Sequence, residues 1–86
     1  MPPARRSKPR SPEHAALGEA VRTLRVEAGM SQEALADAAG TDLTQVGGIE
    51  RGVRNPSYTT LLRLAAALET TVGNLTTLAD GLCERG

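Results

Sequence analysis

The stretch GMSQEALADAAGTDLTQVGGIERG, residues 29–52, decides the fold because it encodes two short helices joined at one glycine. Ser31 is a favoured helix N-cap, and the segment that follows it ends at Gly40. Asp42 is a second N-cap, which opens a helix from Leu43 to Arg51. The positions expected to be buried in the two helices are Leu35, Ala36, Ala39, Val46 and Ile49.

Small residues at two positions allow these helices to pack closely. Ala36 lies where the helices cross, and a larger side chain there would push them apart. Gly40 can adopt the positive φ that turns the chain. The stretch therefore predicts a helix-turn-helix, whose second helix projects from the protein surface.

Three further helices are expected outside this stretch. The first spans residues 13–28, with Gly29 after its end, and its apolar stripe consists of Leu17, Val21, Leu24 and Ala28. After a loop at Val53–Pro56, Ser57 caps a helix that continues through Leu68. A weaker helix is expected from Thr71 or Val72 to Leu82, because threonine and glycine lower its helix propensity.

Composition places these helices in one small all-α domain. The chain has 86 residues, of which 40% are hydrophobic, and Tyr58 is its one aromatic residue. No run of alternating apolar and polar residues predicts a strand. We expect a domain at residues 13–86 and a disordered basic arm at residues 1–12, whose four prolines and four basic residues cannot form a core.

The charge is unevenly distributed. The formal net charge is zero, and four of the ten basic residues precede residue 13. From residue 13 on, six basic residues face ten acidic ones, a net of −4. Any affinity for nucleic acid must therefore come from a few placed cations and the arm. The sequence leaves open whether the arm contacts DNA or is a solvated leader.

Several classes of protein are excluded. No apolar stretch is long enough to span a membrane, and no secretory signal follows the basic arm, so we expect a cytoplasmic protein. Cys83 is the only cysteine and has no disulfide partner. Cys83 and His14 together are too few ligands for a structural zinc ion, so we expect neither a metal site nor a cofactor. No nucleophile–base pair or phosphate loop indicates an enzyme.

Two runs of sequence carry a resemblance to a known family. They are Gly29-Met30-Ser31-Gln32-Glu33 with Leu35-Ala36, and Ile49-Glu50-Arg51-Gly52 with Arg54-Asn55-Pro56-Ser57. Between about Leu17 and Leu82 the chain resembles the Cro/repressor (XRE) family of helix-turn-helix transcriptional regulators. The resemblance implies a compact five-helix, lambda-repressor-like domain that binds operator DNA as a homodimer.

The resemblance also implies roles for individual residues. The candidates for base contacts are Asp42, Leu43, Thr44, Gly47, Gly48 and Arg51. The candidates for phosphate contacts are Gln32, Gln45, Arg54, Asn55 and Ser57. Arg25 and Glu50 are expected to form a buried ion pair, and Leu75, Leu78 and Leu82 a dimer surface, unless these leucines only close the core of the monomer.

The chain departs from the family at the groove-facing positions. Leu43, Gly47 and Gly48 stand where long polar side chains are common, so few donors for direct base contacts remain beside Arg51. Either the glycines let the backbone approach DNA, or this helix has lost strict sequence recognition. The alternative function is a protein-interaction module, antitoxin-like or polymerase-contacting, with weak DNA binding.

Overall fold

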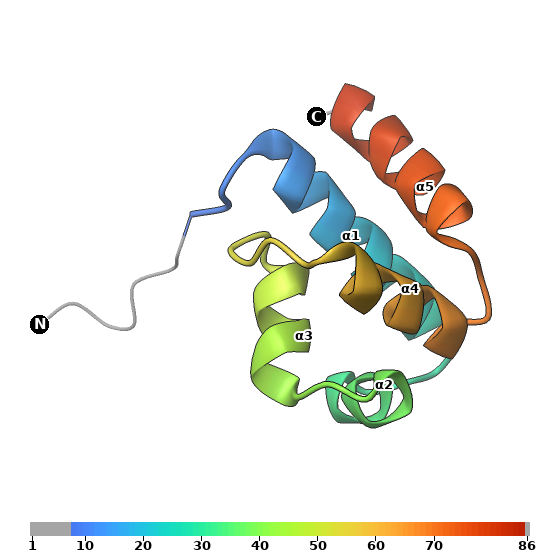
Figure 1. The fold of residues 1–86 in the computed structure, drawn as a ribbon. Coiled ribbons are helices and arrows are strands. Elements are labelled where there is room, and N and C mark those ends of the chain that lie inside the picture. Colours follow the sequence, from blue (N-terminus) through green and yellow to red (C-terminus); the bar gives the residue numbers. More distant parts are fainter. Residues whose placement is uncertain (1–7, 86) are drawn as a thin grey trace, which may run out of the picture.

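The computed structural model describes residues 8–85, with side chains up to Glu84. Within these residues it has five helices and no strand, as predicted (Figure 1). The helices are α1 (Pro12–Glu27), α2 (Gln32–Ala39), α3 (Leu43–Glu50), α4 (Tyr58–Ala67) and α5 (Val72–Arg85). None of them combines the length and hydropathy that crossing a bilayer requires.

Side-chain caps fix where the helices begin. The predicted caps Ser31, Asp42 and Ser57 each accept a hydrogen bond from the backbone N–H three residues further on, at 2.8–3.1 Å. Ser11 and Thr71 do the same for α1 and α5, each at 3.0 Å. Each cap satisfies a backbone donor that has no partner inside the helix.

The predicted arm at residues 1–12 is too long. Its first seven residues lie outside the described part of the chain, but Ser11 caps α1 and Pro12 is the first helical residue. The backbone N–H of Arg10 donates to the carbonyl of Gly52 at 2.8 Å. The folded unit therefore begins before Glu13, with Arg10 attached to the end of α3.

The core consists of aliphatic side chains from all five helices. The largest fully buried ones are Val21, Leu35, Val46, Ile49, Leu64 and Leu75. α1 packs against α3 and α5, and α2 packs against α3 and α4. Figure 1 shows α1 and α5 side by side, with α2 and α3 in the part of the molecule away from α5. The α5 helix continues past the predicted Leu82 because Leu82 and Cys83 still pack against the core.

The turn between α2 and α3 has the predicted geometry. Gly40 has a φ of +69°, and the N–H of Thr41 donates to the carbonyl of Ala36 at 2.9 Å. Ala36 on α2 is only 3% exposed. This closes α2 with a left-handed cap and directs α3 away from it.

Gly18 allows α1 to approach the end of α3. A Cβ atom at Gly18 would meet the backbone carbonyl oxygens of Ile49 and Glu50. Backbone atoms cannot rotate aside as a side chain does, so the two helices would have to separate.

We expect Gly18→Ala to lower the free energy of unfolding by about 1–3 kcal/mol, the usual range for overpacking. Gly81→Ala is the matched control because Gly81 lies in α5 with no atom near its missing Cβ. The control should gain about 1 kcal/mol from helix propensity. Urea denaturation measures both, and equal stabilities for the two variants would contradict this account of the α1–α3 contact.

Candidate nucleic-acid interface

The first turn of α3 presents its predicted contact residues at the surface. Leu43 is 47% exposed and Thr44 is also exposed, while Val46 and Ile49 are buried on the opposite side. The Asp42 carboxylate accepts the N–H of Gln45 at 2.8 Å, so it caps the helix. A carboxylate in this cap repels phosphate, and therefore Leu43 and Thr44 are better placed than Asp42 to contact DNA.

The last turn of α3 is covered by arginine. Gly47 and Gly48 are both buried, which corrects the prediction that the glycines themselves face the groove. A Cβ at Gly47 would lie 3.0 Å from Nη1 of Arg51. A Cβ at Gly48 would lie 2.5 Å from Cγ of Arg54. The surface that this turn offers to a partner is thus provided by two guanidinium-bearing side chains.

These arginines line an open pocket beside α3. Its volume is about 610 Å³, and its lining consists of Arg10, Gln45, Arg51, Val53, Arg54 and Asn55. Three of the six are cationic and none is acidic. Such a hollow attracts anions, because every charge at its wall has the same sign. Three predicted phosphate contacts, Gln45, Arg54 and Asn55, lie here with the predicted base contact Arg51.

His14 holds the loop that carries Asn55. Its Nε2 lies 3.1 Å from Oδ1 of Asn55, and its Nδ1 lies 2.7 Å from Oγ of Ser11. A neutral imidazole with the proton on Nε2 satisfies both contacts, since Nε2–H donates to the amide oxygen and Nδ1 accepts from the hydroxyl. His14, which the sequence left without a role, joins the start of α1 to the loop before α4.

The predicted Arg25–Glu50 pair is present, and it is partly buried. Nε of Arg25 lies 2.6 Å from one Glu50 carboxylate oxygen, and Nη2 lies 3.1 Å from the other. The side chains are 12% and 3% exposed, respectively. Nη1 of Arg25 also donates to the carbonyl of Met30 at 2.8 Å. The hydrogen bond to Glu50 raises the pKa of Arg25 above its ordinary value; burial opposes this shift, and the charge of Glu50 adds to it.

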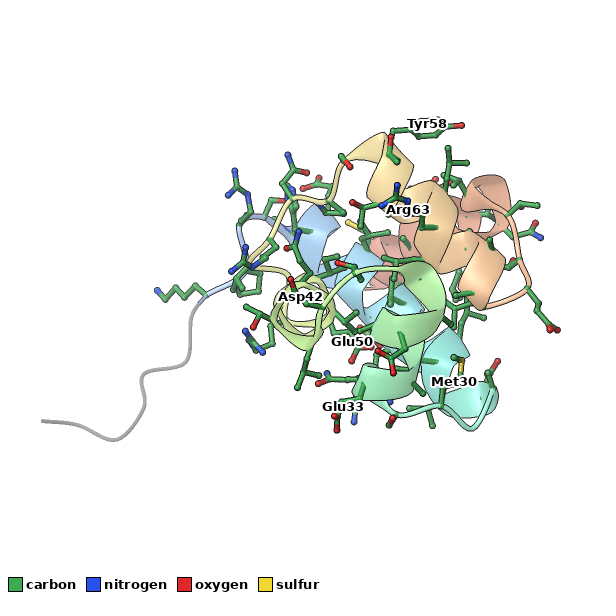
Figure 2. All side chains as sticks on the ribbon, turned by 60° about the horizontal axis from the view of Figure 1, so that its bottom comes forward. Met30, Glu33, Asp42, Glu50, Tyr58 and Arg63 are labelled. Carbon is green, nitrogen blue, oxygen red and sulfur yellow. The ribbon has the colours of Figure 1, made fainter. Side chains whose placement is uncertain are left out.

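Gln32 belongs to the same network. Its Nε2 donates to Glu50 at 2.9 Å, and the side chain is half-buried at the start of α2. If Gln32 contacts a phosphate as predicted, its side chain does so in addition to its hydrogen bond with Glu50. Figure 2 shows Glu50 among the helices, whereas Glu33 projects outward from α2.

The remaining predicted residues lie at two other places. Ser57 is exposed, and its hydroxyl caps α4 and donates to Oγ1 of Thr60 at 3.0 Å. Leu75 is fully buried inside the monomer, which corrects its assignment to a dimer surface. Leu78 and Leu82 are half-buried on α5 and remain candidates for that surface.

Sequence reasoning missed Arg10 and His14 as parts of this interface. The contact between His14 and Asn55 joins residues 41 positions apart, and no local pattern signals it. The basic residues before α1 were a signal for Arg10, but not for its contact with Gly52. Tyr58, the one aromatic residue of the chain, is 66% exposed at the start of α4 (Figure 2).

Comparisons with known proteins agree with this arrangement. A family model described as helix-turn-helix matches residues 21–75. The chain is 44% identical over 61 residues to the control protein C.SmaI of Serratia marcescens. The matched region covers 71% of this chain and 73% of that protein.

Two solved structures are similar. The restriction-modification controller protein C.AhdI from Aeromonas hydrophila has 42% identity and a TM-score of 0.74, covering 76% of this chain and 98% of that chain. The controller protein C.Esp1396I, solved as a tetramer in complex with its natural 35-base-pair operator, has 27% identity and a TM-score of 0.78. That match covers 86% of this chain and 97% of the other.

We expect Glu50→Ala to lower the melting temperature sharply. The substitution leaves the Arg25 guanidinium with little exposure and without its carboxylate, at a cost of about 3–5 kcal/mol. Glu84→Ala, at an exposed carboxylate on α5, is the control and should melt like the parent. Thermal unfolding followed by circular dichroism measures the melting temperatures of both variants. Equal melting temperatures would contradict a stabilising role for the Arg25–Glu50 pair.

Proposed function

The chain belongs to the Cro/repressor-type helix-turn-helix family, and we propose that it is a sequence-specific transcriptional repressor that binds a palindromic operator as a homodimer. The observation that carries the proposal is the arginine-lined pocket beside the projecting helix α3. An otherwise acidic body presents three arginines next to the element that enters a major groove.

The geometry supports distinct roles along α3 and the loop after it. We propose that Arg51 contacts a guanine, since a guanidinium can donate two hydrogen bonds to N7 and O6. Leu43 and the methyl group of Thr44 suit a thymine methyl. Phosphates would be bound by donors at the edges of the helix pair, namely the half-buried Gln32 and Gln45 and the exposed Arg54, Asn55 and Ser57.

The relatives support a more specific form of this proposal. C.SmaI, C.AhdI and C.Esp1396I are control proteins, and the last two are restriction-modification controllers by name. We propose that this chain likewise controls the genes of a restriction-modification system. It would act by binding, without catalysis, in the cytoplasm where its operator lies.

A homodimer would place two copies of α3 on one face of the duplex. Half-sites about one helical turn apart, roughly 34 Å, match two recognition helices related by a two-fold axis. Leu78 and Leu82 on α5 are proposed as the dimer surface, because each is only half-buried in the monomer.

The first test is selection from random duplex DNA at low salt, followed by a salt titration of the selected sequence. We expect a palindrome, with the logarithm of the binding constant falling linearly with the logarithm of salt concentration, by about 0.9 per phosphate neutralised. If no sequence is enriched and binding is weak, the interaction module is the better proposal. Capture of a protein partner would then be the next step.

The dimer surface is tested by sedimentation of Leu78→Asp, with Leu62→Asp as the comparison on the exposed side of α4. We expect only the first variant to become monomeric while keeping its helical circular dichroism. A folded Leu78→Asp dimer would remove α5 from the proposal. Dissociation by Leu62→Asp alone would move the surface to α4.

A further inference from the structure

Two adjacent glycines inside α3 require an explanation. Glycine is an unfavourable residue in a helix interior, yet Gly47 and Gly48 occupy the middle of an eight-residue helix. They do not serve contact between α3 and its own core, because Val46 and Ile49 form that face. Close approach of DNA to their backbone does not explain them either, since both are already buried in the free protein.

The returning loop explains why Gly48 has no room for a side chain. The carbonyl of Gly48 accepts the backbone N–H of Val53 at 2.9 Å and that of Arg54 at 3.3 Å. These bonds draw the backbone of the loop onto the last turn of α3, and the Arg54 side chain crosses directly over Gly48. A Cβ there would lie 2.5, 2.8 and 2.9 Å from Cγ, Cδ and Nε of Arg54. The whole stem of the side chain occupies the place of the missing methyl group.

Gly47 accommodates Arg51 less tightly. A Cβ would lie 3.0 Å from Nη1 of Arg51 and 3.8 Å from Oε1 of Gln32. Only the flexible end of Arg51 would have to move, by a few tenths of an ångström. The two positions therefore differ in how much arginine displacement an added methyl group would cause.

The arginines that lie over Gly47 and Gly48 have no acidic partner within residues 8–84, whose side chains the structure describes. Among the residues that the structure describes, the one ion pair is Arg25–Glu50. Arg51, Arg54 and Arg10 instead line the same pocket, where like charges repel unless an anion binds between them. An arginine that already lies in its binding orientation loses less side-chain entropy when a partner arrives.

We propose that Gly47 and Gly48 are positioning residues, which hold Arg51 and Arg54 along the surface of α3 in the orientation that meets DNA. Gly48 acts through Arg54 on a phosphate, and Gly47 acts through Arg51 on a base edge. This inference rests on the proposed DNA-binding function, but the arrangement of Gly48 and Arg54 can be tested without DNA.

The experiment is a double-mutant cycle of Gly48→Ala and Arg54→Ala, measured on the selected operator duplex. In the parent background we expect Gly48→Ala to weaken binding about tenfold and to reduce the salt slope by about 0.9, the value for one phosphate contact. In the Arg54→Ala background it should have no effect, because the displaced side chain is absent. Gly47→Ala should weaken binding less, and Gly81→Ala should bind like the parent.

A second measurement is independent of DNA. The Nε–H resonance of Arg54 in the ¹⁵N spectrum of the free protein should shift in Gly48→Ala and stay in place in Gly81→Ala. Gly81→Ala should melt no lower than the parent, since alanine favours helix. An unchanged Arg54 resonance, or equal loss of binding in both backgrounds of the cycle, would overturn the positioning role. If the parent binds no duplex, the proposed function fails and the resonance decides the arrangement separately.

Discussion

The partly buried ion pair between Arg25 and Glu50 is the contact on which the presentation of α3 depends. It joins the end of α1 to the end of α3, and Gln32 adds the start of α2 to the same carboxylate. A buried ion pair contributes little net stability relative to a well-packed apolar pair. Its consequence is geometric, because any displacement of α3 that breaks it leaves a charge in a place from which water is largely excluded.

Close helix packing makes this network possible in a chain with one aromatic residue. The core has only aliphatic side chains to exclude water, so the backbones themselves must approach one another. Gly18 lets α1 approach the carbonyls of Ile49 and Glu50, and the small residue Ala36 is buried on α2, which packs against α3. The approach at Gly18 also places the backbone of Glu50 beside α1, within reach of Arg25. Packing and the polar network thus have a common origin in small residues.

Local sequence rules predicted the helices well because each rule concerns neighbouring residues. Ser31, Asp42 and Ser57 cap helices where they were expected, and Gly40 turns the chain. Contacts across the fold escaped prediction, since the His14–Asn55 contact and the Arg10–Gly52 bond depend on how α1 meets the loop before α4. The burial of Leu75 likewise follows from the packing of α5, which periodicity does not determine. The glycines of α3 were noted as exceptional in the sequence, but the loop that covers them was not predictable from local spacing.

The balance of charge bears on how such a protein could select one site among many. Non-specific affinity for DNA grows with the number of phosphates that a surface neutralises, wherever the cations lie. Here, from residue 13 on, acidic residues outnumber basic ones, while Arg10, Arg51 and Arg54 converge on one hollow beside α3. The acidic residues on the rest of the protein repel the duplex from its other faces. Productive encounters are therefore those in which α3 faces the DNA. Few cations also mean weak non-specific binding, and it is the ratio of specific to non-specific affinity that determines occupancy of an operator. The orientation of each arginine then matters more than the total charge, which is why the residues beneath Arg51 and Arg54 are as informative as the arginines themselves.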